Sequence, residues 1–153
     1  MVLQQPIHHK KLFMTMQENT QIAREAYRLF GQGDIDGILD LYTEDVEFVF
    51  PGPGEFVPLS GTYRGKEQVR QFFGKVYEYL EFTSFEPQEF VSNGDKVIVI
   101  GHDTGKVRMT DKSFEEDWVH ISTFRNGKVA RWQAFVDTAR LVNDFNPEKA
   151  AVI

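Results

Sequence analysis

The chain has 153 residues, of which 41% are hydrophobic and 14% aromatic, and it contains no Cys. This length suits a single domain with a substantial core, and the lack of Cys excludes disulfides, thiolate nucleophiles and Cys-type zinc sites. The formal net charge is -6 and Lys and Arg form no cluster, so we expect no binding to nucleic acid.

The first residues give no sign of a targeting or membrane segment. Residues 1–15 lack an apolar run long enough for a signal peptide, and no stretch of ~18 apolar residues occurs anywhere in the chain. We therefore predict a cytoplasmic protein that does not bind membranes. We interpret residues 1–15 as a poorly ordered N-terminal extension, 16–143 as the domain and 144–153 as a C-terminal tail.

Apolar residues at helical spacing predict three helices in the first half of the chain. The first begins near Glu18, where Asn19 or Thr20 could cap it, and ends near Gly31. Asp34 is expected to cap a short second helix. A third helix is predicted over residues 65–80, because its apolar residues share one face.

Period-two alternation predicts strands instead of helices in the second half. The expected strands, after a short early one at 46–50, are residues 82–91, 96–107, 114–124 and 129–137. Turn residues separate them, most clearly Asn126-Gly127. The order of elements predicts an α+β fold in which N-terminal helices pack on a strongly curved antiparallel sheet that encloses a pocket.

The Asn126-Gly127 hairpin fixes which residues of its two strands share a face. Alternation places Trp118, His120 and Ser122 together on one face. On the last strand the apolar set that we expect to face inward is Ala130, Trp132, Ala134 and Val136. For residues 96–107, periodicity alone leaves open whether the face with Gly101 and Asp103 or the opposite face is inward.

Three motifs in order resemble the SnoaL-like and ketosteroid isomerase-like proteins. They are Gly33-Asp34-Ile35-Asp36-Gly37-Ile38-Leu39 with the following Leu41-Tyr42 and Glu44-Asp45-Val46, then Gly61-Thr62-Tyr63-Arg64-Gly65-Lys66, and last Asn126-Gly127-Lys128-Val129. The resemblance spans roughly Met16 to Asn143. It implies the cone-shaped nuclear transport factor 2-like fold, in which the sheet wraps a cavity against the first and third helices, commonly in a homodimer packed through the outer sheet face.

The catalytic residues of these families carry over poorly. At the positions of the ketosteroid isomerase residues, Phe50 replaces the base and His120 the protonated aspartate. Ala26 replaces the tyrosine, with Tyr27 one residue away. Against the limonene epoxide hydrolase-like members, Gly101 replaces the arginine and Asp103 retains one aspartate. Ala134 lies on or near the second aspartate. The resemblance therefore implies the fold and not one of these mechanisms.

With the inward face of the family applied, Asp103 and His120 point into the cavity from neighbouring strands. We predict them as catalytic residues, with the carboxylate orienting the imidazole for acid/base chemistry. The remaining predicted ligand-binding residues are Trp118, Trp132, Phe50, Tyr42, Tyr63, Phe73, Ala134, Ser122 and Gly101. The alternative is that these residues are core packing and satisfied hydrogen-bonding partners.

The predicted function is binding of a small apolar or aromatic molecule, possibly with isomerase, cyclase or hydrolase-type chemistry. The alternative is a non-catalytic binding or dimeric interaction module. No cofactor is expected, and no metal, because none of the four His lies on a predicted helix with an Asp or Glu at ligand spacing. The apolar outer sheet face, with Ile98, Ile100, Val119 and Ile121, predicts a homodimer.

Overall fold

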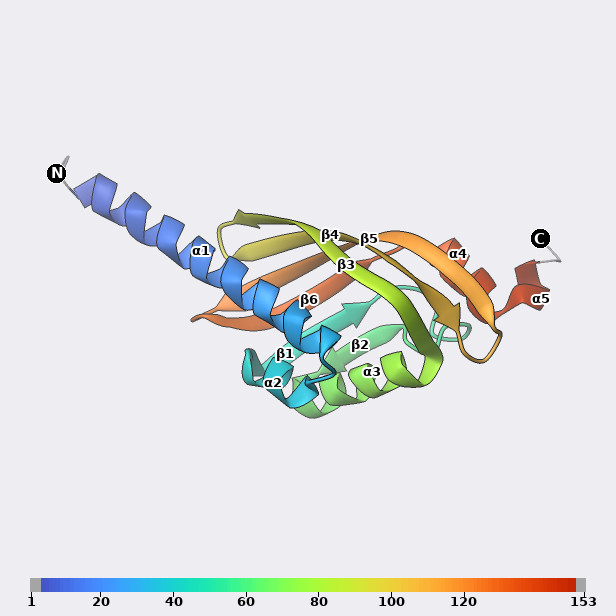
Figure 1. Cartoon of the computed structure of the whole chain (residues 1–153). Coiled ribbons are helices and arrows are strands. Elements are labelled where there is room, and N and C mark those ends of the chain that lie inside the picture. The colour runs from blue at the N-terminus through green and yellow to red at the C-terminus, as the bar shows by residue number, and fades with distance from the viewer. Residues whose placement is uncertain (1–3, 151–153) are drawn as a thin grey trace.

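A computed structural model describes residues 4–150 of the chain, with side chains for residues 15–148. The helices are α1 (Gln4–Gly31), α2 (Ile35–Asp40), α3 (Gly65–Tyr79), α4 (Thr138–Phe145) and α5 (Pro147–Ala150). The strands are β1 (Tyr42–Phe50), β2 (Gly61–Arg64), β3 (Leu80–Asn93), β4 (Lys96–Val107), β5 (Lys112–Arg125) and β6 (Lys128–Phe135). The predicted α+β class is confirmed (Figure 1). Strand β2 and helices α4 and α5 were not predicted.

Helix α1 begins well before the predicted start at Glu18. Thr20, expected near the cap, lies inside the helix, where its hydroxyl donates to the Met16 carbonyl at 3.0 Å. Residues 4–15, predicted to be an extension, form the first turns of α1, which extend beyond the sheet in Figure 1. Residues 1–3 and 151–153 lie outside the described residues. No helix within residues 4–150 is long and apolar enough to cross a membrane.

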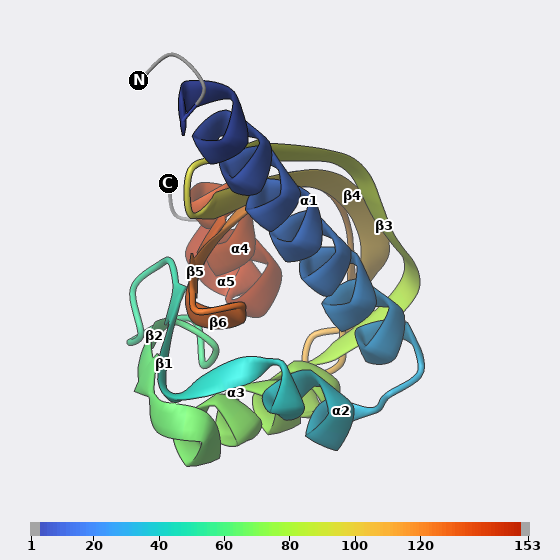
Figure 2. The same cartoon turned by 90° about the vertical axis from the view of Figure 1, so that its left-hand side faces the viewer.

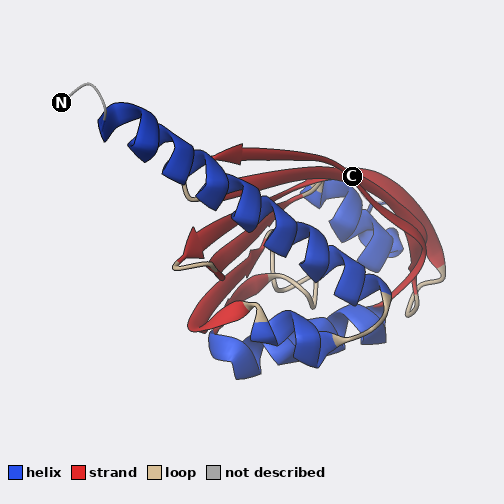
Figure 3. Cartoon of the chain, turned by 60° about the vertical axis from the view of Figure 1, so that its left-hand side comes forward, coloured by secondary structure: helices blue, strands red, loops and turns tan. Residues whose placement is uncertain are grey.

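The six strands form one sheet in the order β2-β1-β6-β5-β4-β3. The expected wholly antiparallel sheet is wrong in one place, because β1 pairs with β6 in parallel. Between β1 and β6 the chain forms β2, α3 and three more strands, β3 to β5, and then returns beside β1. A parallel pair requires such a long connection. Figures 2 and 3 show the sheet curving around α1 and α3, which cover its concave side.

The Asn126-Gly127 turn between β5 and β6 forms as predicted. Asn126 has φ 51° and Gly127 φ 77°, the left-handed values that a two-residue type I′ hairpin turn requires. The predicted inward face of β6 needs one correction, since the register slips by one residue at Ala130. This bulge turns Val129 into the core in place of Ala130, while Ala134 stays fully buried.

The C-terminal helix α4 packs onto the domain. Asp137 caps it by accepting a hydrogen bond from the Arg140 backbone N–H at 3.1 Å. Asp144 and Phe145 are only 2% and 3% exposed, although they fall within residues 144–153, which the sequence assigned to a tail. Helix α4 therefore brings its own polar side chains to one end of the sheet.

The outer sheet face carries partly exposed isoleucines and valines, with Phe135 at 46% exposure. We expect two chains to pack through this face, because a single chain leaves it in contact with water. Ile100→Lys should convert the dimer to a monomer of about 17.7 kDa in light scattering. Tyr77→Lys, an exposed position on α3, should leave the dimer intact. A wild-type monomer at high protein concentration would overturn this prediction.

Candidate functional site

The concave side of the sheet encloses a cavity of about 100 Å³ between helices α1 to α3 and strands β1 and β3 to β6. Most of its wall is aromatic or aliphatic, and its polar side chains are few. The volume is well below the ~300 Å³ of a typical drug-sized ligand pocket. As it stands, the cavity has room for a molecule of about one ring.

Stacked rings form the central wall. The Trp118 ring lies 4.0 Å from the His120 ring, 4.9 Å from Phe85 and 5.9 Å from Tyr27, all near parallel. Trp132 meets His120 edge-on at 4.6 Å. These contacts hold the rings rigidly, so the wall offers flat apolar surfaces at fixed positions.

Most of the predicted site residues line this cavity. Those that do are Asp103, His120, Trp118, Trp132, Phe50, Tyr42, Phe73 and Ser122. They reach it from five different elements, because the curvature of the sheet brings the inward faces of its strands together. Their proposed roles toward a ligand stay predictions.

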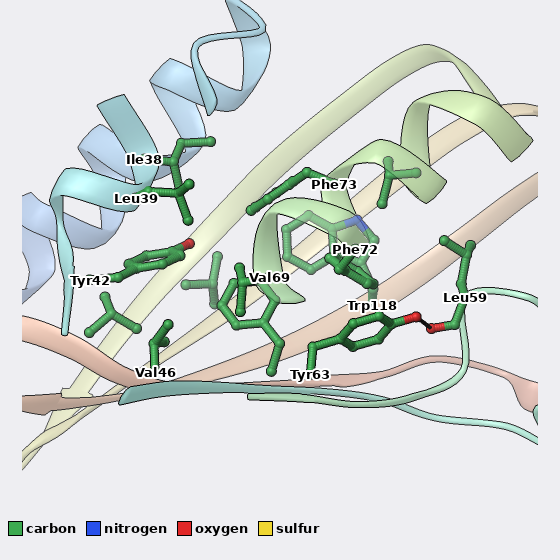
Figure 4. Close-up of a cluster of buried hydrophobic side chains, with 14 of the residues drawn as sticks. Ile38, Leu39, Tyr42, Val46, Leu59, Tyr63, Val69, Phe72, Phe73 and Trp118 are labelled. Carbon is green, nitrogen blue, oxygen red and sulfur yellow. Dashed lines mark hydrogen bonds between the residues drawn. The ribbon is translucent and has the colours of Figure 1, made fainter. Parts of the chain in front are cut away.

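The structure places the remaining three predicted residues in the surrounding core. Gly101 lies beneath Trp118, where a Cβ atom would come within 2.6 Å of the indole Cε2. Ala134 is fully buried opposite His120 in the sheet. The Tyr63 hydroxyl donates to the Leu59 carbonyl at 2.8 Å, the dashed line in Figure 4. These three residues shape the packing around the cavity and do not line it.

His120 does not pair with Asp103. In the β4–β5 register His120 lies opposite Val99 and Asp103 opposite Glu116, with Trp118 between them, so the two Cα atoms are roughly 13 Å apart. His120 Nδ1 instead shares a hydrogen bond of 2.8 Å with the Tyr27 hydroxyl. Burial lowers the pKa of His120 to about 3, so its imidazole is neutral at physiological pH.

Asp103 pairs with Glu116 on the neighbouring strand, and both line the cavity. Burial, and to a smaller extent the neighbouring Glu116, together raise the pKa of Asp103 from 3.8 to about 8. Burial also raises the pKa of Glu116, against the opposing effect of Arg140. Asp103 is therefore protonated near neutral pH and hydrogen-bonded to Glu116.

Helix α4 supplies the cation beside this carboxyl pair. The Arg140 guanidinium bridges Glu116 and Asp144 through two short ion pairs. Only 12% of the Glu116 side chain is exposed, and 3% of that of Asp144. The arrangement places one arginine between two carboxylates, with the protonated Asp103 at the cavity end.

Three residues of the site were not predicted. Tyr27 was not predicted because the catalytic tyrosine of the ketosteroid isomerases matches Ala26, one position away. Glu116 shares the period-two face of Trp118 and His120, so continuing that alternation by one step would have found it. No pattern in the sequence indicated Arg140 as a site residue, because only tertiary packing brings α4 to the sheet.

The described residues contain no cluster of three or more His, Asp or Glu side chains that could hold a metal ion. The polar groups among the residues that line the cavity are two carboxyl groups, one neutral imidazole, the hydroxyls of Tyr27, Tyr42 and Ser122, and the indole N–H groups of Trp118 and Trp132. Hydrogen bonding and proton transfer are the chemistry that these groups can supply.

The curved sheet, the two covering helices and the enclosed cavity define a cone-shaped protein of the nuclear transport factor 2-like fold, as the sequence predicted. Residues 23–132 match the SnoaL-like domain. The chain belongs to this family. A comparison with curated proteins finds no match.

Solved structures support the same assignment. A nuclear transport factor 2-like protein from Burkholderia xenovorans is 38% identical, with a TM-score of 0.79 over 86% of this chain and 98% of that one. A second from Burkholderia pseudomallei, of unknown function, is 27% identical, with a TM-score of 0.77 over 84% and 97%. TerC, co-crystallised with polyporic acid, is 30% identical, with a TM-score of 0.75 over 84% and 98%.

Proposed function

We propose that the cavity binds a small aromatic molecule and that the Asp103–Glu116 carboxyl pair transfers a proton to or from it. The observation that carries this proposal is the position of the pair. Two acidic side chains lie together in the wall of an otherwise apolar cavity. Carboxyl groups in such a setting are rare in a core that serves packing alone.

The pair has the charge distribution that proton transfer requires. Asp103 holds a proton, Glu116 is ionised beside Arg140, and the Oδ1 atom of Asp103 has no hydrogen-bond partner among the described residues. A pKa of about 8 for Asp103 lies close to neutral pH, where a group can both donate and accept a proton. Such a site could move a proton between two atoms of one ligand without a cofactor.

The aromatic wall supports a flat ligand. The cavity is lined by Trp118, Trp132 and several phenylalanines, and aromatic rings of this kind favour stacking with a flat ligand over a bulky aliphatic group. TerC, which shares the fold and 30% of its residues with this chain, was co-crystallised with polyporic acid. We therefore include polyporic acid among the ligands to be tested.

The alternative is a binding module without catalytic activity. The cavity volume of about 100 Å³ favours it, because a substrate and its transition state need more room than a single ring unless side chains move. In that case the carboxyl pair would serve only to hold α4 on the sheet through Arg140. Binding and turnover must therefore be measured separately.

Two measurements test the proposal. Native mass spectrometry with acetophenone, a single-ring ketone, should show one bound molecule per chain. Polyporic acid has three rings and should bind only if side chains of the cavity wall move. In D₂O, the carboxylate should remove a methyl proton of acetophenone and an O–D group should return a deuteron, which NMR detects as loss of the methyl proton signal. Asp103→Asn and Glu116→Gln should each slow this exchange by about 100-fold or more.

Asp95→Asn is the matched control, because it removes a carboxylate whose side chain is 64% exposed. This variant should exchange at the wild-type rate. Binding without any exchange by the wild type would favour the non-catalytic module. Absence of binding by both compounds would contradict both functions.

A further inference from the structure

A buried hydrogen bond ties His120 to Tyr27 of α1. Burial raises the pKa of the Tyr27 hydroxyl, and a smaller effect of Trp132 opposes this rise. The net pKa of Tyr27 is well above its ordinary value, so the hydroxyl keeps its proton. The Tyr27 oxygen and Nδ1 of His120 are 2.8 Å apart.

The Tyr27 hydroxyl decides which nitrogen of His120 carries the proton. A buried O–H needs an acceptor, and within residues 15–148 the hydrogen-bond partner of this hydroxyl is Nδ1 of His120. The Tyr27 O–H therefore donates to His120 Nδ1. A neutral imidazole whose Nδ1 accepts a hydrogen bond carries its proton on Nε2.

Nε2 is the free polar atom of this ring. His120 lines the cavity, and no hydrogen bond to Nε2 occurs within residues 15–148. The ring is held on one face by Trp118 at 4.0 Å and at its edge by Trp132 at 4.6 Å, so Nε2–H points in a fixed direction.

We infer that His120 acts as a neutral hydrogen-bond donor, which presents Nε2–H to an acceptor oxygen such as the carbonyl of an aromatic ketone, and not as a base. This inference rests on the proposed binding of a small aromatic molecule and narrows its class. A ligand would place its ring against the Trp118 wall and a carbonyl oxygen on Nε2. The role differs from the acid/base function that the sequence suggested for His120.

The first test measures the tautomer directly in the wild-type protein. A two-dimensional ¹H–¹⁵N spectrum of the imidazole should show the Nε2–H form of His120, unprotonated from pH 5 to pH 8. Tyr27→Phe removes the donor to Nδ1 and should reduce the share of this tautomer. Tyr63→Phe, which deletes a buried hydroxyl outside the cavity, should leave the spectrum unchanged.

The second test compares two probes of the same shape, acetophenone and α-methylstyrene, which differ in having C=O or C=CH₂. Acetophenone should bind about fivefold more tightly to the wild type, as expected for one hydrogen bond. Tyr27→Phe should reduce this preference. An Nδ1–H tautomer, a protonated ring at pH 6, or equal binding of the two probes would overturn the inference. If neither probe binds, the proposed function fails, while the imidazole spectrum still decides the state of His120.

Discussion

Gly101→Ala should lower the free energy of unfolding by about 3 kcal/mol, at the upper end of the cost of overpacking a core. The added methyl group would overlap Cζ2 and Cη2 of Trp118, whose side chain is 2% exposed. A rigid indole stacked against Phe85 and His120 cannot move away without disturbing those rings. Urea denaturation monitored by tryptophan fluorescence measures the change.

Gly74→Ala is the control for this substitution. Gly74 lies in α3, and a Cβ atom there meets nothing within 4 Å. Since alanine is the better helix former, this variant should gain up to about 1 kcal/mol. A Gly101→Ala protein as stable as the wild type would show that Trp118 has another position available, and that the cavity wall is less rigid than described.

Asp103→Asn should stabilise the protein at pH 8 relative to the wild type, while making no such difference at pH 4. The pKa of Asp103 is raised on folding, from 3.8 to about 8. The folded chain therefore keeps a proton that the unfolded chain loses above pH 4. Stability from this group is complete below pH 4 and is lost as pH rises through 8.

The size of the effect follows from the same linkage. The stability difference between Asp103→Asn and wild type should grow steadily from pH 4 to pH 8, because unfolding of the wild type releases the Asp103 proton over this range. Comparing the two proteins at one pH cancels the contribution of His120, whose pKa is shifted in the opposite direction. Chemical denaturation across this pH range gives the curve.

Asp95→Asn again provides the reference. The carboxylate of Asp95 is exposed, so the stability difference between this variant and wild type should change far less with pH than that for Asp103→Asn. Parallel curves for Asp103→Asn and wild type would show that Asp103 is ionised in the folded protein, which would contradict the proposed proton donor. A variant that is more stable but inactive in the exchange assay would instead be typical of a residue kept for function at a cost in stability.

Local signals in the sequence were enough for most of the fold. Asp34 caps α2 by accepting from the Gly37 backbone N–H at 2.9 Å, and Asn126-Gly127 forms its hairpin turn. Both effects act over two to four residues, so the chain carries them without its tertiary context. The turn also fixes which alternate residues of β5 share a face. Trp118, His120 and Ser122 were therefore correctly placed together on one face.

The partners within the site depend on distances that the sequence does not contain. Alternation together with the inward face of the family placed Asp103 and His120 on the same face, but register set them opposite Glu116 and Val99, respectively. Register depends on how two strands slide past each other. The hydrogen bond between Tyr27 and His120 also requires α1 to pack on the sheet so that Tyr27 lies beside β5.

The sequence by itself determined the α+β class, the family, the two strands that bear the polar residues and the aromatic character of the wall. Only the tertiary structure decided that His120 is neutral and bonded to Tyr27, and that Asp103 holds a proton beside Glu116 and Arg140. The physical reason is that periodicity specifies a face, whereas pKa and hydrogen-bond partners depend on burial and on contacts between elements distant in the chain.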